Sequence, residues 1–385
     1  MQNIITCKGG YMDKNYLGSD IKNLGFGLMR LPMKDDVIDI EQTKNMVDAF
    51  MAKGFNYFDT AYVYIGGMSE VAAREAIVKR YPRDSFYLAT KLAMWEVKEP
   101  GDMEKQLETS LSRAGVDYFD FYLIHSLQTG INIENTDKFN AWDFVLNAKK
   151  EGKVKHVGFS FHDTPEMLDD LLTKHPEMEF VQLQINYADW DNEDVQSRKC
   201  YEVCMKHDKP VVIMEPVKGG SLAMMHPSIA KPMTDYAPDK SLASWAIRYA
   251  ASLPGLITVL SGMSKEDQMQ DNLTTMENFV PISDEEKEVI AKVVDGIRNT
   301  KSIPCTACKY CVDDCPMQIN IPELFSIYNS YMVYNNMHAA KWAYNEATKE
   351  RGKASECLHC GMCESHCPQH ISIIENLEKI AELFE

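Results

Sequence analysis

The stretch Tyr118-Phe-Asp-Phe-Tyr-Leu-Ile-His125 is an apolar, β-like run that ends in an ionisable side chain. Seven more runs of this kind occur in the first three hundred residues: Gly25–Met29, Phe55–Asp59, Phe86–Lys91, Val154–Ser160, Phe180–Asn186, Pro210–Glu215 and Leu256–Ser261. Helical patterns lie between them, for example Thr43–Lys53, Met103–Ala114, Lys138–Glu151 and Ser241–Ser252. Eight strands with helical crossovers predict an α/β fold of the (β/α)8 TIM barrel type. The competing doubly wound sheet would carry a G-x-G-x-x-G turn after a strand, which this sequence lacks.

Polar side chains stand where the apolar runs stop. In a barrel the chemistry lies at the carboxyl ends of the strands. Each polar residue taken alone has an ordinary explanation, such as a helix cap, a surface lysine or a core histidine. Together they predict a convergent acid–base set, whose members are Asp59, Lys91, His125, Ser160, Gln184, Asn186 and Glu215.

Eight of the 11 cysteines lie in two matching runs near the end of the chain. Both runs have the spacing C-x2-C-x2-C-x3-C-P, which is that of bacterial iron–sulfur proteins. They are Cys305-Thr-Ala-Cys308-Lys-Tyr-Cys311-Val-Asp-Asp-Cys315-Pro316 and Cys357-Leu-His-Cys360-Gly-Met-Cys363-Glu-Ser-His-Cys367-Pro368. Zinc sites usually use separate C-x2-C pairs, so the spacing favours two [4Fe-4S] clusters over zinc.

The spacing also predicts how the cysteines are shared. Two-residue gaps let one short loop turn three thiolates toward one cluster, whereas the fourth thiolate points away and reaches the other cluster. Cluster 1 is therefore assigned to Cys305, Cys308, Cys311 and Cys367, and cluster 2 to Cys357, Cys360, Cys363 and Cys315.

About forty residues separate the two runs. They contain one helical pattern from Ile321 to Met332 and a second through Ala340, Trp342 and Tyr344. The segment Thr300–Glu385 thus resembles the small, mainly α-helical ferredoxin-like domain of multi-subunit oxidoreductases. We expect a barrel over residues 1–282, a bridging helix over 283–299 and the cluster domain over 300–385.

The barrel region resembles the aldo-keto reductase family from Leu24 to Asn278. The resemblance rests on Gly54-Phe-Asn-Tyr-Phe-Asp59-Thr-Ala-Tyr-Val-Tyr64 with Ser69-Glu70, on Ala89-Thr-Lys91 and on Tyr118–His125. It implies a catalytic tetrad of Asp59, Tyr64, Lys91 and His125, and a nicotinamide dinucleotide extended across the barrel mouth. The residue chemistry agrees: Lys91 would lower the pKa of Tyr64, Asp59 would fix Lys91, and His125 would orient a substrate carbonyl.

The same resemblance implies the cofactor contacts. The nicotinamide carboxamide is expected at Ser160 and Gln184, although Phe161 replaces the Asn that commonly follows that Ser. The pyrophosphate is expected at Pro216, Lys218, Gly219 and Gly220, and the adenosine at Ser264, Gln268 and Asn272. NADPH-preferring members carry Lys and Arg where this chain has Gly262 and Gln268, so both NADH and NADPH stay open. FMN is a further candidate, because a flavin can divide an electron pair between one-electron carriers.

The net charge of −17 argues against nucleic acid or an anionic membrane surface as partner. Neither a signal peptide in Met1–Lys14 nor a membrane span is visible, so we expect a cytoplasmic protein. Because the cytosol keeps thiols reduced, the cysteines are not expected to form a disulfide framework; Cys7 carries no signal.

Three functions follow. The first is an oxidoreductase that reduces a small-molecule carbonyl or related substrate and relays electrons through its clusters, with a ferredoxin or flavodoxin as candidate carrier. The second is a plain NAD(P)H-dependent carbonyl reductase whose clusters are structural or regulatory. The third is a non-catalytic electron-transfer or redox-sensing subunit, which the intact tetrad argues against. The sequence leaves the substrate and the oligomeric state open.

Overall fold

The computed structural model describes residues 17, 20–130, 132–193, 195–300, 303–305, 307–309, 311–312, 315–365, 367, 369 and 371–385. The expectations placed on Met1–Lys14, Cys7 and Pro368 lie outside these described residues. The chain forms two compact units. The barrel unit runs to Lys218 and resumes over Ala243–Ile282, and the second unit comprises Gly219–Leu242 and Ser283–Glu385.

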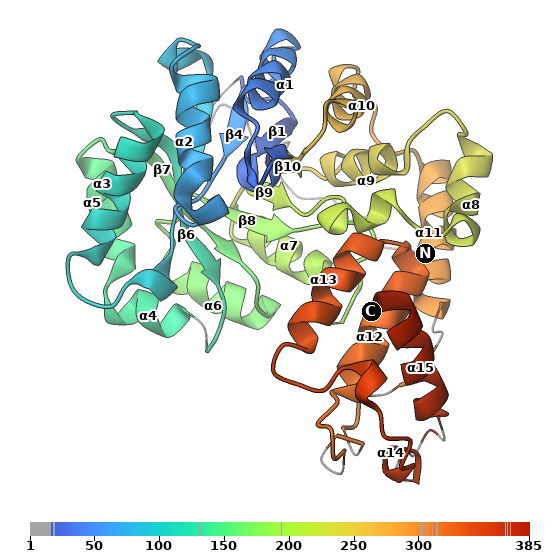
Figure 1. Ribbon diagram of the computed structural model, residues 1–385. Coiled ribbons are helices and arrows are strands. Elements are labelled where there is room, and N and C mark those ends of the chain that lie inside the picture. The colour runs from blue at the N-terminus through green and yellow to red at the C-terminus, as the bar shows by residue number, and fades with distance from the viewer. Residues whose placement is uncertain are drawn as a thin grey trace. The chain divides into compact units, whose positions relative to one another are not determined.

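Eight parallel strands close into a barrel in the order β1-β10-β9-β8-β7-β6-β5-β4, which confirms the predicted fold class (Figure 1). Each strand overlaps one of the eight apolar runs, and several strands extend one or two residues beyond it. Their bounds are β1 Leu24–Gly27, β4 Tyr57–Asp59, β5 Tyr87–Leu92, β6 Phe119–Leu127, β7 Val154–Phe161, β8 Phe180–Gln184, β9 Val211–Met214 and β10 Leu256–Gly262. The short strands β2 (Met33–Lys34) and β3 (Val37–Ile38) form a separate antiparallel pair.

Helices cover the outside of the barrel (Figure 1). They are α1 Ile40–Ala52, α2 Met68–Ala73, α3 Asp102–Ala114, α4 Ile133–Lys138, α5 Ala141–Lys150, α6 Pro165–Lys174, α7 Ser197–Lys206, α9 Leu242–Ala251 and α10 Glu266–Glu277. Local sequence explains several ends: Asp39 caps α1, and Thr164 caps α6 ahead of Pro165. The helix predicted over Lys138–Glu151 is α5, which begins three residues later than predicted because Asn140 adopts a left-handed φ of 53° and separates it from α4.

Aromatic and aliphatic side chains fill the barrel interior, where Tyr57, Phe121, Phe180 and Val212 are fully buried. Close packing inside a barrel leaves little room for extra atoms. Gly158 shows this: a Cβ there would lie 2.3 Å from the carbonyl oxygen of Phe180 on the neighbouring strand. The filled interior leaves the strand ends as the place for chemistry.

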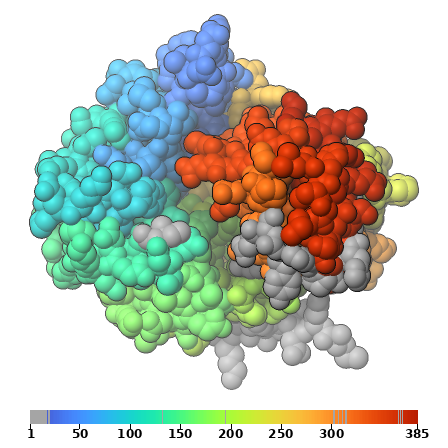
Figure 2. Space-filling view, turned by 60° about the horizontal axis from the view of Figure 1, so that its bottom comes forward, coloured from blue at the N-terminus to red at the C-terminus, as the bar shows by residue number. Residues whose placement is uncertain are grey.

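The second unit is helical, as expected. Its helices are α8 Pro227–Tyr236, α11 Asp284–Asn299, α12 Ile321–Tyr334, α13 Met337–Ala347, α14 Met362–Ser365 and α15 Ile373–Phe384. Helix α11 begins at a capping box in which Ser283 and Glu286 bond each other's backbone N–H groups. The apolar faces of α12, α13 and α15 share a core that includes Phe325, Tyr344 and Phe384, and their outer faces form a continuous orange-to-red surface (Figure 2). None of the helices among the described residues is long and apolar enough to cross a membrane.

Candidate functional site

Asp59 and Lys91 form a buried ion pair at the ends of β4 and β5. Lys91 Nζ lies 2.6 Å from Asp59 Oδ2 and donates a second hydrogen bond of 2.7 Å to the carbonyl oxygen of Thr60. Burial lowers the pKa of Lys91, but the charges of Asp59 and Tyr64 outweigh it and the pKa is raised. Lys91 is therefore an ammonium ion whose position is set on two sides.

Tyr64 lies beside this pair. Lys91 Nζ is 4.7 Å from the centroid of the Tyr64 ring. Burial raises the pKa of Tyr64, and the Lys91 charge lowers it by less, so the net pKa is raised. We expected Lys91 to bring this pKa below its ordinary value near 10. The Lys91 charge does lower the pKa of Tyr64, as expected. The pKa is nevertheless raised overall, because burial of the phenol raises it by more.

A second buried group holds the segment that carries Tyr64. Glu70 accepts a 2.7 Å hydrogen bond from Thr90 Oγ1 and lies 3.4 Å from the guanidinium of Arg113. Arg113 in turn donates a 2.9 Å hydrogen bond to the carbonyl oxygen of Tyr62. Glycine suits position 67, because its φ of 86° is left-handed and a Cβ there would also displace that guanidinium. These contacts fix the turn that follows Tyr64.

His125 completes the group from β6. Its ring centroid is 5.6 Å from that of Tyr64, in an edge-on arrangement. Burial lowers the pKa of His125 well below its ordinary value of 6.5, and the Lys91 charge lowers it further, so the ring is neutral at pH 7. Its Nδ1 is buried without a hydrogen-bond partner among the described residues. The structure thus brings all four predicted tetrad side chains together.

Three large aromatic side chains, Trp95, Tyr187 and Trp190, follow the strands β5 and β8, and one of them lies at this group. The Trp95 ring is 5.1 Å from that of His125, and Trp95 is 37% exposed. Tyr187 and Trp190 instead pack around Tyr249, at 5.9 and 6.0 Å between ring centroids. Of the three, Trp95 is placed to meet a substrate, and the other two contribute to packing.

The residues expected at the nicotinamide have partners within the protein. Ser160 Oγ accepts a 2.7 Å hydrogen bond from the backbone N–H of Ser126. Gln184 donates a 2.9 Å hydrogen bond to Asp189. Asp189, which the sequence did not single out, also binds Asn186 at 2.8 Å and Lys218 at 2.6 Å. It is almost fully buried and ties the ends of β8 and β9 together.

The residues expected at the adenosine lie just before α10, at Ser264, and within it, at Gln268 and Asn272. The backbone N–H of Ser264 donates a 2.8 Å hydrogen bond to Gln268, and Ser264 Oγ donates to the carbonyl oxygen of Arg30 at 2.9 Å. Asn272 is buried and binds Ser261 at 3.0 Å. Sequence reasoning missed Arg30, although it is a basic residue just past the first apolar run. Its half-exposed guanidinium lies 3.4 Å from Glu215.

The segment expected at the pyrophosphate turns sharply after Pro216. Lys218, Gly219 and Gly220 have left-handed φ values of 50°, 62° and 94°. Glycine adopts this conformation without steric cost, so two of the three positions suit the turn. The barrel unit ends at Lys218, and Gly219 begins the second compact unit.

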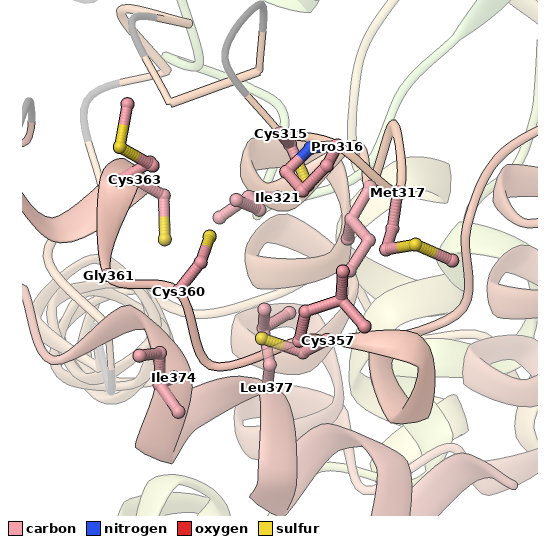
Figure 3. Close-up of a pocket in the computed structure, with 13 residues that line it drawn as sticks. Cys315, Pro316, Met317, Ile321, Cys357, Cys360, Gly361, Cys363, Ile374 and Leu377 are labelled. Atoms are coloured by element: carbon pink, nitrogen blue, oxygen red, sulfur yellow. The ribbon is translucent and has the colours of Figure 1, made fainter.

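The eight cysteines line two hollows, each of four cysteines. The first hollow is lined by Cys305, Cys308, Cys311 and Cys367. The second is lined by Cys315, Cys357, Cys360 and Cys363 (Figure 3). Each hollow takes three cysteines from one run and the fourth from the other, which is the arrangement that the spacing predicts. Four thiol donors within apolar walls suit an iron–sulfur cluster.

The aldo/keto reductase family model matches residues 23–295. The chain belongs to the aldo-keto reductase family. A 4Fe-4S dicluster domain model matches residues 304–372 and so covers both cysteine runs. This aldo-keto reductase is therefore an oxidoreductase that carries a 4Fe-4S dicluster domain, and the second match favours clusters over the zinc alternative.

Similar proteins span different shares of this aldo-keto reductase. A probable aldo-keto reductase of Glycine max is 30% identical over 45% of this chain and 50% of its own length. An uncharacterized oxidoreductase of Bacillus subtilis is 25% identical over 68% of this chain and 90% of its own. The chain thus spans half of one relative and most of the other.

Two solved structures share the barrel. A holo-form aldo-keto reductase from Bacillus halodurans is 25% identical, with a TM-score of 0.57 over 70% of this chain and 91% of that one. An aldo-keto reductase from Klebsiella pneumoniae, in complex with NADP and acetate, is 20% identical, with a TM-score of 0.57 over 71% of this chain and 92% of that one. At 20% identity the second likeness shows the fold alone. Neither protein supports the FMN expectation.

Proposed function

We propose that this aldo-keto reductase reduces a small-molecule carbonyl or related substrate with Tyr64 as proton donor, and that its clusters exchange electrons with a carrier protein. The observation that carries the proposal is the buried Lys91–Asp59 pair beside Tyr64, with a 2.6 Å contact, in a chain that also has two four-cysteine hollows. The barrel would supply the carbonyl reduction, and the cysteine-rich domain would supply the electron exchange.

Tyr64 suits proton donation. Its raised pKa keeps the phenol protonated at neutral pH. The Lys91 ammonium beside the ring stabilises the negative charge that develops as the proton leaves. Asp59 and the carbonyl oxygen of Thr60 hold that ammonium in place, so little reorganisation is needed during the transfer.

His125 suits substrate orientation. A neutral imidazole carries one N–H donor, which can bind a carbonyl oxygen without giving up its proton. The low pKa of His125 keeps it in this form. Trp95, next to the imidazole, offers an apolar surface to the rest of the substrate.

We assign a nicotinamide dinucleotide, NADPH or NADH, to the predicted positions, where it would supply hydride. These are Ser160, Gln184, Pro216, Lys218, Gly219, Gly220, Ser264, Gln268 and Asn272. The half-exposed Arg30 beside Ser264 adds a cation where the cofactor's phosphates would need one. The NADP complex of the Klebsiella protein supports the cofactor class.

We assign cluster 1 to the first hollow and cluster 2 to the second, where they would supply one-electron transfer. The carrier would be a small one-electron protein of the ferredoxin or flavodoxin type. A nicotinamide gives up its electrons as a pair, so a relay between cofactor and clusters calls for a flavin to divide them.

An anaerobic spectrum tests the proposal. The protein should bind about eight irons, as two cubanes require, the same spectrum should show the flavin that divides the electron pair, and NADH or NADPH should bleach the cluster absorption. Unbleached clusters, together with NAD(P)H-dependent ketone reduction, would overturn the relay and leave a plain reductase with structural or regulatory clusters. As a control, Tyr64→Phe should keep the bleaching and lose ketone reduction. Unchanged activity in that variant would instead favour a non-catalytic barrel.

A further inference from the structure

Asp189 is a buried carboxylate that binds three side chains at the barrel mouth. Only 1% of its surface is exposed. Its Oδ1 accepts a 2.6 Å hydrogen bond from Lys218 Nζ, and its Oδ2 accepts from Asn186 Nδ2 at 2.8 Å and from Gln184 Nε2 at 2.9 Å. Both oxygens are engaged within the protein, so Asp189 acts on a ligand only through the side chains that it holds.

The contact with Asp189 fixes the orientation of the Gln184 amide. An ionised carboxylate only accepts hydrogen bonds, whereas a glutamine amide has one donor end and one acceptor end. Nε2 therefore faces Asp189, at 2.9 Å, and Oε1 faces away from it. The half-buried Gln184 thus presents an acceptor oxygen to a ligand in the barrel mouth.

Ser160 offers the complementary group on the neighbouring strand. In the register of β7 and β8 it pairs with Gln182, and Gln184 lies two residues farther along the same face of β8. Ser160 Oγ accepts a 2.7 Å hydrogen bond from the backbone N–H of Ser126, which leaves its hydroxyl hydrogen to donate. The two strand ends therefore offer one donor, at Ser160, and one acceptor, at Gln184.

Lys218 secures Asp189 at a conformational cost. Its φ of 50° is left-handed, a region that lysine adopts less readily than glycine. The cost is kept although Gly219 and Gly220 follow directly, which indicates that the lysine side chain has a role. Its ammonium, 2.6 Å from Asp189, compensates the buried negative charge. Lys218 thereby holds the carboxylate that orients Gln184.

We propose that Asp189 is a positioning residue for the nicotinamide carboxamide, acting through Gln184, and that it makes the site selective for a cofactor whose ring carries an amide N–H. The inference rests on the proposed function, which assigns a nicotinamide dinucleotide to this site. A carboxamide has an acceptor oxygen and a donor NH2 group, which match the Ser160 hydroxyl and Gln184 Oε1. A ring substituent with a carbonyl but no N–H leaves Gln184 Oε1 without a donor, which costs affinity.

Isothermal titration calorimetry of the anaerobic holoprotein tests the selectivity with two analogues of the tighter-binding cofactor, NAD+ or NADP+. The acetylpyridine analogue replaces the NH2 group by a methyl group, and the thionicotinamide analogue keeps the NH2 group and replaces the oxygen by sulfur. Wild type should bind the acetylpyridine analogue roughly 2- to 12-fold more weakly than the natural cofactor, the effect of one neutral hydrogen bond. Asp189→Asn should bring this ratio close to 1, because one amide oxygen cannot hold three donors and the Gln184 amide is free to turn. The ratio for the thionicotinamide analogue should not change.

Two further variants separate this role from general damage. Asp191→Asn removes a carboxylate two residues away, whose partner is the exposed Arg198 at 2.6 Å, and should leave both ratios at their wild-type values. The double variant Asp189→Asn/Lys218→Met leaves neither partner of the buried ion pair charged and should lose selectivity as Asp189→Asn does. It therefore reports on Asp189 even where the single variant is too unstable to titrate.

An acetylpyridine ratio near 1 in wild type would overturn the inference. So would a wild-type ratio retained in Asp189→Asn and in the double variant, or an equal change in the ratios for both analogues. Failure of the proposed function looks different. Wild type that binds neither NAD+ nor NADP+ would overturn the cofactor assignment and the inference together. The expected loss of selectivity, in a protein whose clusters NAD(P)H does not bleach, would support the inference and reject only the relay.

Discussion

The barrel site and the cysteine hollows are built in opposite ways. In the barrel, Asp59, Lys91 and His125 stand at the ends of adjacent parallel strands and contact one another directly or through Tyr64. The cysteines instead stand on short loops with left-handed residues, and Cys308 and Cys360 are exposed. We therefore expect the fold alone to order the barrel site and the cysteine loops to depend on the group they bind, so that metal binding there also contributes folding free energy.

The largest effect that sharpens this contrast is expected from removing the iron. The described part of the second unit shares a small core between α12, α13 and α15, and the crossed cysteines would link its two runs through the clusters. We expect hydrogen exchange of the iron-free chain to show lost protection in these helices and unchanged protection in β4 to β7. If the backbone amides of α12 and α15 stay protected from hydrogen exchange without iron, the cysteine-rich unit does not depend on its clusters for folding, and the contrast with the barrel site fails.

Tyr64→Phe should have the next largest effect, confined to the barrel. Loss of a positioned general acid typically costs a factor of about 10² to 10⁴ in rate, and we expect kcat to fall by that amount with iron content unchanged. Steady-state kinetics and an iron assay measure both. The neighbouring Tyr62→Phe is the matched control, because Arg113 binds Tyr62 through its carbonyl oxygen. Equal losses in both variants would contradict a specific role for Tyr64.

Lys91→Met should cost stability as well as activity. It leaves Asp59 buried without its cation, and breaking a buried pair in this way typically costs about 3–5 kcal/mol. Urea unfolding of the barrel should show this loss. The double variant Asp59→Asn/Lys91→Met should recover much of it, since no buried charge is then left alone. A single variant as stable as wild type would mean that Asp59 is better solvated than its burial indicates.

His125 should give the smallest effect, a dependence of stability on pH. Its pKa in the folded protein lies well below 6.5, so below that pH the unfolded chain binds a proton that the folded chain does not. This contribution is fully present above pH 6.5 and is lost as pH falls, by up to about 1.4 kcal/mol per pH unit. Comparing unfolding at pH 7.5 and 5.5, we expect His125→Gln to lose less stability than wild type; equal losses would contradict the assignment.

Much of the architecture was predictable because its signals are local. Each apolar run such as Tyr118–His125 overlaps a barrel strand, since a strand buried in a closed sheet needs apolar side chains whatever its neighbours are. The cysteine spacing predicted the crossed hollows for a similar reason: a short loop can turn only a few thiols to one side. Asn140 is the local exception, because its left-handed backbone is not visible in the apolar periodicity.

The contacts of Arg30 and Asp189 were not predictable in this way. Arg30 meets Glu215 across 185 positions of sequence, and Asp189 gathers side chains from the ends of β8 and β9. Such pairs depend on where the strands end in space. Trp95 lies beside His125, whereas Trp190 packs against Tyr249. This difference likewise depends on how the loops fold over the strand ends.

The sequence by itself determined the barrel and the helical character of the cluster domain, and it predicted the sharing of the cysteines, because strand periodicity, helix periodicity and ligand spacing are properties of neighbouring residues. The four tetrad candidates came from the family resemblance of the motifs that contain them. Only the tertiary structure decided the net direction of the Tyr64 pKa and the neutral state of His125. Those properties follow from burial and from charges brought close by folding, and neither quantity exists until the chain is packed.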